Sequence, residues 1–355
     1  GSIAQVHRAR LKDGQEVVVK VRRAGLRPLV EADLRLLSHA AGLAEKQWPE
    51  FSRYRSREIL HRLGIAMSEE LDLAAEGRNC ETISENLAGM EAISIPRIFS
   101  EWTCERLLVQ EFVDGIVPTD RESIEAAGLD GRVLAERGAT AFLRMALIDG
   151  VFHADPHPGN LRALPGNEVA FIDFGMVGRI GGRRREQLLG LVGAIVDSSG
   201  ARVGALLVDW AGSTDIDPSR LEAACDAYVG RHSVPPLKLG EAVSDFMALA
   251  REHDLALPSD LALLFKALIT ADGVMRSLDP GFDAIAVAAP IVREEMRRRY
   301  APRAIVGKGQ ALALDLAGLA SDLPSLLRLL ALRLRQGRIA ADIELKGLDR
   351  IGGDI

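Results

Sequence analysis

One short stretch, FHADPHPGNL at residues 152–161, combines reactive side chains with residues that break regular structure. It holds two histidines, an aspartate and an asparagine around Pro156, Pro158 and Gly159. Proline lacks an amide hydrogen and clashes with the preceding helical turn, so this stretch cannot lie inside a helix. The sequence therefore predicts a stiff loop that carries imidazole, carboxylate and carboxamide groups, a set that suits a metal, a proton relay or a phosphate.

The spacing of acidic and amide residues narrows the chemistry of this loop. Asn160 follows Asp155 by five residues, and the motif Asp173-Phe174-Gly175 begins 18 residues after Asp155, at the end of an apolar segment. Protein kinases combine a catalytic aspartate, an asparagine five residues later and a D-F-G motif. The joint spacing predicts Asn160 and Asp173 as Mg²⁺ ligands, because Mg²⁺ prefers oxygen donors. Asp155 is then the catalytic group, which accepts a proton or orients a nucleophile.

Two other interpretations of the loop stay open. His153 and His157 could bind zinc, or the loop could serve only as a cap and a turn. No cysteine lies near these histidines and no H-E-x-x-H motif occurs in the chain, which argues against zinc. We expect His153 to brace the loop backbone, and His157 either to do the same or to face phosphate groups.

The beginning of the chain predicts a β-hairpin with a lysine in its second strand. Residues 3–9 and 16–21 have strand-like patterns, and Asp13-Gly14 between them is a hairpin turn signal. Lys20 lies in the valine-rich second strand and corresponds to the kinase lysine that pairs with ATP phosphates. Such a buried lysine needs a carboxylate partner.

The acidic segment SEELDLAAEGRN at residues 68–79 offers candidates for that partner. If the segment is one continuous helix, Glu69, Asp72 and Glu76 share a face at about 100° per residue. Like charges so spaced repel on an isolated helix. The acidic face is therefore either solvated or paired with a lysine or Mg²⁺.

Most of the remaining chain has a helical pattern. Gly150 is expected to stop a helix over residues 130–149. Two apolar segments predict buried strands, and the expected elements are helices within residues 28–90 and 183–340 and strands at 106–115 and 169–175. A small β-rich part thus precedes a large helical part.

Composition excludes several classes of protein. The net charge of −6 argues against a nucleic-acid partner. Three widely spaced cysteines form no metal-binding or disulfide pattern, which indicates a reducing compartment. No uncharged apolar run reaches the length of about 18 residues that a membrane helix needs. The chain opens as if in the middle of a structural unit, so we expect a fragment of a longer protein.

Together the motifs resemble the UbiB family of atypical kinases, also called the ADCK family, over roughly residues 1–300. The markers are GSIAQVHRA followed by VVVK, ELD with Glu76 and Asn79 after it, HADPHPGN and DFG. The resemblance implies an α+β, two-lobed protein-kinase-like fold with a small β-rich N-lobe that carries inserted helices and a large helical C-lobe. We expect an N-lobe over 1–115, a C-lobe over 116–300 and a helical extension over 301–355.

The resemblance also assigns roles to residues. Lys20 becomes the phosphate-pairing lysine and Glu76 its ion-pair partner. ATP and Mg²⁺ are the implied cofactors, Asp155 takes the catalytic role, and Asn160 and Asp173 hold the metal. The residues implied in nucleotide binding, besides Lys20, are Gly1 and Ser2 in the loop over the phosphates, Glu111 and Val113 in the adenine hinge, and Glu70 and Asp72 in the E-x-D motif.

The implied function is ATPase or small-molecule or lipid kinase activity that supports ubiquinone biosynthesis. Protein phosphorylation is disfavoured, because only about ten residues separate Asp173 from the next predicted helix and no A-P-E motif follows. Two alternatives stay open: a phosphotransferase of the aminoglycoside or choline kinase type, which has a similar loop and IDFG, and a non-catalytic nucleotide-sensing scaffold.

The resemblance implies isoprenoid lipids and quinone-biosynthesis enzymes as partners, at the cytoplasmic side of a membrane for the full-length protein. We expect the fragment itself to be soluble, without the family's upstream K-x-G-Q region and its C-terminal membrane helices. The leucine- and arginine-rich residues 323–338 predict either a core helix or a membrane-surface helix.

Overall fold

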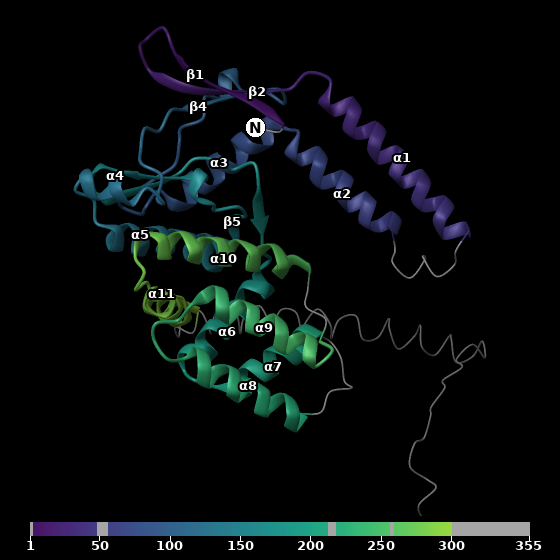
Figure 1. The fold of residues 1–355 in the computed structure, drawn as a ribbon, viewed down its shortest axis with the longest axis vertical. Coiled ribbons are helices and arrows are strands. Elements are labelled where there is room, and N and C mark those ends of the chain that lie inside the picture. The colour runs from purple at the N-terminus through teal and green to yellow at the C-terminus, as the bar shows by residue number, and fades with distance from the viewer. Residues whose placement is uncertain (1–2, 48–55, 212–217, 256–258, 300–355) are drawn as a thin grey trace, which may run out of the picture. The chain divides into compact units, whose positions relative to one another are not determined.

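The computed structural model describes residues 3–47, 56–211, 218–255 and 259–299 (Figure 1). Contacts group residues 1–294 into one unit and 295–355 into another. The predicted roles of Gly1 and Ser2 and the predicted extension over 301–355 lie outside the described residues. The predicted boundary near residue 115 falls within the first unit and stays a prediction.

The N-terminal sheet is the hairpin that the sequence predicts, extended by one strand. Its strands are β1 (Ala4–Arg10), β2 (Glu16–Arg22) and β4 (Leu107–Glu111), antiparallel in the order β1-β2-β4. Gly14 closes the hairpin turn at a φ of 93°, a conformation that glycine adopts without strain. The strand predicted over 106–115 is shorter, because pairing with β2 ends at Glu111.

Three helices lie between β2 and β4: α1 (Leu26–Gln47), α2 (Ser56–Glu70) and α3 (Leu73–Leu87). Helix α1 packs along α2 (Figure 1). The assumption of one continuous helix over residues 68–79 is wrong. Helix α2 ends at Glu70, and Asp72 is the N-cap of α3, where its side chain accepts a hydrogen bond from the Ala74 amide. Glu69, Asp72 and Glu76 therefore do not share one helical face.

Two small sheets and a turn carry the loop at residues 152–161. Helix α5 (Gly131–Arg144) continues into a π-helical turn, Met145–Asp149, and ends at Gly150 with a φ of 72°, as predicted. The sheets follow the order β3-β7-β6 and β5-β8. Their strands are β3 (Ile93–Ser94), β5 (Val151–His153), β6 (Leu161–Leu164), β7 (Glu168–Phe171) and β8 (Val177–Arg179), with short helix α4 (Arg121–Ala126) before α5.

Successive helices make up the rest of the described chain, as the sequence predicts. They are α6 (Gly182–Val196), α7 (Gly200–Ala211), α8 (Pro218–His232), α9 (Leu239–Glu252), α10 (Ser259–Leu278) and α11 (Ala284–Arg299). Helix α10 packs along α5 and α9. The ring of Phe246 meets the rings of Trp210, Tyr228 and Phe265 in the core. The predicted α+β class is confirmed. Within the described ranges, no helix has the length and apolar character needed to cross a membrane.

Candidate active site

Lys20 is the centre of a cluster of three charged residues, of which Lys20 and Glu76 are buried and Asp173 is partly exposed. Its ammonium lies 2.5 Å from Glu76 Oε1 and 2.7 Å from Asp173 Oδ2. Lys20 comes from β2, Glu76 from α3, and Asp173 from the loop that follows β7. Lys20 is 8% exposed and Glu76 is 7% exposed. Three distant segments thus place one cation between two carboxylates.

The surroundings push the pKa values of these three groups in different directions. Burial lowers the pKa of Lys20, but the two carboxylates outweigh burial and raise it. Burial raises the pKa of Asp173, but Lys20 and the Gly175 amide outweigh burial and lower it. For Glu76 burial dominates and raises the pKa despite Lys20. The Asp173 carboxylate therefore ionises more readily than the Glu76 carboxylate, and a carboxylate must be ionised to bind a metal ion.

The histidines of the loop at 152–161 hold its backbone. His153 is 1% exposed, and its Nδ1 accepts a hydrogen bond of 3.2 Å from the Asp155 amide. His157 Nδ1 accepts a hydrogen bond of 3.0 Å from the Gly159 amide. No three His, Cys, Asp or Glu side chains come together as a metal site in the described part of the chain. Both histidines brace the loop, as expected for His153.

Asn160 and Asp173 have atoms that fit Mg²⁺. Asn160 Nδ2 donates to the Asp155 carbonyl at 3.1 Å, which leaves Oδ1 for a cation. The Asn160 carbonyl accepts a hydrogen bond from the Ile172 amide at 3.0 Å, and this bond ties the loop to the residue before Asp173. Mg²⁺ usually takes one or two protein oxygens together with substrate phosphates. A site with one carboxylate and one carboxamide therefore suits a magnesium-bound nucleotide.

A cavity of about 340 Å³ lies beside these residues. Lys20, Asn160 and Asp173 line one part of it. The two predicted hinge residues also line it: Glu111 is the last residue of β4, and Val113 follows that strand. The volume lies within the usual range for small-ligand pockets. The structure thus brings the predicted hinge, lysine and metal ligands to one cavity.

Two amide side chains support the D-F-G segment, and no role was predicted for either. Gln110 is 5% exposed on β4, and its Nε2 donates to the Ile172 carbonyl at 3.0 Å. Asn79 Nδ2 donates to the Phe174 carbonyl at 3.3 Å, and its Oδ1 accepts from Arg179 at 3.2 Å. A glutamine inside the apolar run LLVQEFV is the sequence signal that could have drawn attention to Gln110.

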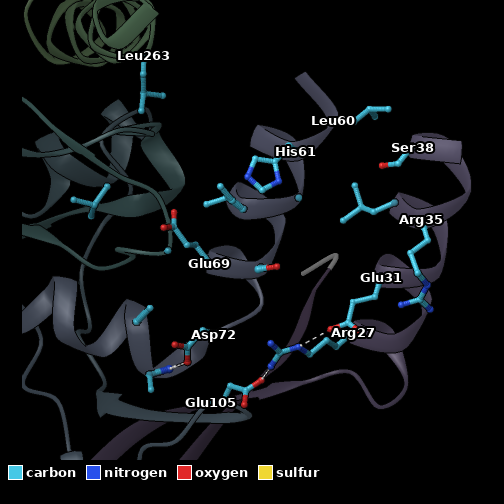
Figure 2. A pocket seen from close by; sticks show the side chains of 18 of the residues that line it. Arg27, Glu31, Arg35, Ser38, Leu60, His61, Glu69, Asp72, Glu105 and Leu263 are labelled. Carbon is cyan, nitrogen blue, oxygen red and sulfur yellow. Dashed lines mark hydrogen bonds and ion pairs between the residues drawn. The ribbon is translucent and has the colours of Figure 1, made fainter. Parts of the chain in front are cut away.

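The two residues of the E-x-D motif, Glu70 and Asp72, do not line the 340 Å³ cavity. Glu70 is exposed at the end of α2. Asp72 caps α3, pairs with Arg78 at 3.1 Å and lines a larger cavity of about 1800 Å³. Figure 2 shows this larger cavity, with Arg27 paired with Glu31 and Glu105 in its wall and with Leu263 at its far edge. A nucleotide-binding role for Glu70 and Asp72 stays a prediction.

A lysine–glutamate pair under a small β-sheet, beside an asparagine loop and a D-F-G aspartate, defines a protein-kinase-like fold. A solved structure supports this class. The chain resembles Rv3197 of Mycobacterium tuberculosis, solved in complex with erythromycin, with a TM-score of 0.60 and 20% identity. The similarity covers 81% of this chain and 74% of that one. The predicted kinase-like fold is confirmed.

Sequence comparison gives the family. The ABC1 atypical kinase-like domain matches residues 1–207, and the UbiB helical domain matches residues 221–283. The chain therefore belongs to the ABC1/UbiB family of atypical kinases, as the resemblance implied.

Named relatives agree with this placement. A probable protein kinase UbiB of Xanthomonas campestris is 33% identical over 98% of this chain and 66% of its own length. A probable protein kinase UbiB of Vibrio atlanticus is 32% identical over 95% of this chain and 63% of its own length. An uncharacterized Synechocystis protein is 34% identical over 85% of this chain and 54% of its own length. The chain thus spans between about half and two thirds of these relatives.

Proposed function

We propose that the chain binds ATP with Mg²⁺ in the 340 Å³ cavity and hydrolyses the nucleotide or transfers its γ-phosphoryl group to a small molecule or lipid. The observation that carries the proposal is the Lys20 ammonium held between Glu76 and Asp173 at the cavity wall. Phosphoryl transfer depends mainly on positioning and charge stabilisation, and this cluster supplies both.

Each residue of the cluster has a separate task in this proposal. Glu76 orients Lys20, and Lys20 holds the nucleotide phosphates once a ligand competes for its Asp173 contact. Asn160 and Asp173 would hold Mg²⁺, which neutralises charge on the phosphate oxygens when bound. The backbone of Glu111 and Val113 receives the adenine. Asp155 orients the acceptor.

The short connection after the D-F-G motif favours a small acceptor over a peptide. Strand β8 pairs with β5 directly after this motif, and α6 begins at Gly182. Protein kinases use a long segment between D-F-G and A-P-E in this place. We therefore infer that water, a small molecule or a lipid is the acceptor, and that protein kinase activity is not the main role.

A role in ubiquinone biosynthesis is proposed from the relatives named UbiB. Isoprenoid lipids and quinone-biosynthesis enzymes are the proposed partners, and the cytoplasmic side of a membrane is the proposed location. The UbiB helical domain match favours this role over an aminoglycoside or choline kinase role.

The experiment that tests the proposal is phosphate release from Mg-ATP by the chain and by Asp173→Asn, with and without a prenyl-phenol lipid in vesicles. We expect release that needs Asp173 and increases with the lipid. Equal release by both proteins would contradict the site. Tight Mg-ATP binding with no release in any condition would instead support the nucleotide-sensing scaffold.

A further inference from the structure

Helix α10 brings a lysine from the UbiB helical domain to the catalytic loop. Lys266 Nζ lies 3.9 Å from Asp155 Oδ1. The residues around it on α10 are core residues: Leu264, Phe265 and Ala267 are 1%, 4% and 0% exposed. Helix α10 is held along α5 and α9. Lys266 is therefore carried on a well-packed helix, and its side chain reaches the loop that bears Asp155.

The contact between Lys266 and Asp155 contributes little to the stability of the fold. The side chains of Lys266 and Asp155 are 58% and 35% exposed, and exposed ion pairs contribute about 0–1 kcal/mol. The separation of 3.9 Å is also too long for a hydrogen bond. Both groups thus keep their hydrogen-bonding capacity for a third group, such as an acceptor oxygen. Contacts of this kind often tighten only when substrate is bound.

Lys20, the other lysine of the site, contacts different carboxylates. Lys20 contacts Glu76 and Asp173 on the nucleotide side. In the described part of the chain, the basic side chains within 4 Å of the Asp155 carboxylate are His157, also at 3.9 Å, and Lys266. His157 uses Nδ1 for the Gly159 amide. Lys266 therefore places an ammonium group beside the carboxylate expected to orient the acceptor.

The same edge of α10 borders the larger cavity. Leu263, one turn before Lys266, lines that cavity (Figure 2). Gly175 of the D-F-G motif and Val177 at the start of β8 line it too. The cavity wall combines apolar residues such as Leu34 with basic and acidic ones such as Arg35 and Glu69. An amphipathic acceptor lying in that cavity would reach Leu263, which lies one helical turn from Lys266.

We propose that Lys266 is the acceptor-side cation of the site, an inference that rests on the proposed function. The acceptor oxygen forms a bond to the γ-phosphorus while the bond from that phosphorus to the bridging oxygen breaks. The electron pair of the broken bond leaves with ADP, and the acceptor proton passes to Asp155. Lys266 exchanges no proton and stabilises the negative charge of the phosphoryl group as it moves. The helical domain thereby completes a site built mostly by the kinase-like domain.

The test compares Lys266→Met and Lys266→Arg with the matched control Lys238→Met. Lys238 is a similarly exposed lysine that pairs with Glu241 on α9. Phosphate release from Mg-ATP gives kcat, and titration with a non-hydrolysable ATP analogue gives Kd. We expect Lys266→Met to lower kcat about 10- to 100-fold, with an unchanged Kd, because a charge that stabilises the transition state is lost. Lys266→Arg should retain most of kcat, and Lys238→Met should match the parent chain.

Three results would overturn the inference. One is a normal kcat in Lys266→Met alongside an inactive Asp173→Asn, which would leave the proposed function intact. The second is an equal loss of kcat and nucleotide affinity in Lys266→Met, which would indicate a structural or nucleotide-side role. The third is equal release by the parent chain and Asp173→Asn, which would remove the proposed function and this inference with it.

Discussion

The ammonium of Lys20 and the carboxylate of Asp173 meet at 2.7 Å, although 153 positions separate them in the chain. Glu76 shares the same ammonium, so a single cation serves two carboxylates. A phosphate group that replaces Asp173 on Lys20 would release the aspartate toward a metal ion. The stability of the cluster therefore depends on the lysine, the one cation that both carboxylates contact.

Removal of Lys20 should expose the repulsion between its two partners. In Lys20→Met, Glu76 and Asp173 lose their shared cation, and we expect the free energy of unfolding to fall by about 3 kcal/mol. Addition of Glu76→Gln should restore most of that loss, because only one carboxylate then remains. Urea unfolding of the two single variants and the double variant gives the coupling energy. Additive losses would contradict the shared-cation cluster.

Gln110 should affect nucleotide binding without touching the nucleotide phosphates. In Gln110→Ala the half-buried carbonyl of Ile172 loses its hydrogen-bond donor, which costs about 1 kcal/mol. The segment before Asp173 also loses its tie to β4, so we expect weaker Mg-ATP binding as well as lower stability. Exposed Gln47, changed to alanine, is the control. Titration with Mg-ATP measures the affinity. An unchanged affinity in Gln110→Ala would show that nucleotide binding does not need the hydrogen bond between Gln110 and Ile172.

Local sequence signals predicted most of the fold. Two of these signals are glycines, Gly14 in the hairpin turn and Gly150 at the end of a helix, and both adopt a left-handed backbone conformation. The third is the D-F-G segment, which follows a short apolar strand. The break between α2 and α3 was missed because a helical-face calculation assumes continuity. Asp72 is a strong N-cap residue, and capping ends that continuity.

Long-range contacts explain what the sequence could not predict. Arg22 donates to the Leu71 carbonyl at 2.6 Å, and this bond holds the junction of α2 and α3 against β2. Lys20 and Glu76 were paired only through a family motif, since 56 positions separate them. Gln110 and Lys266 belong to no such motif, and only the packing of β4 and α10 brings them to the site.

Gly150 should tolerate no side chain, for two separate reasons. Its φ of 72° is left-handed, and an added Cβ would lie 2.7 Å from the Ile180 carbonyl. We expect Gly150→Ala to lower the free energy of unfolding by more than the roughly 1–2 kcal/mol of left-handed strain alone. Gly166→Ala is the matched control, because Gly166 has a φ of 76° and open space around it. Urea unfolding gives the free energy of unfolding of each variant. Equal decreases in the two variants would show that the structure around Ile180 adjusts to the added methyl group without loss of stability.

His153 should make the stability of the protein depend on pH. Burial lowers its pKa to about 4, from a usual value near 6.5. Between these two values the unfolded chain binds a proton that the folded chain does not, so stability falls as the pH decreases from about 6.5 toward 4. The contribution of His153 to this loss is about 3 kcal/mol, because each pKa unit corresponds to about 1.4 kcal/mol.

The variant His153→Asn isolates this contribution, since asparagine keeps an acceptor for the Asp155 amide and does not titrate in this range. We expect lower stability at neutral pH, because a smaller side chain packs less well against Phe171 and Phe174. Its urea midpoint should then fall less steeply than that of the parent chain between pH 6.5 and 4. His39→Asn, at an exposed histidine, should keep the parent slope. A parallel slope for His153→Asn would mean that other groups, such as the carboxylates around Lys20, set the acid sensitivity.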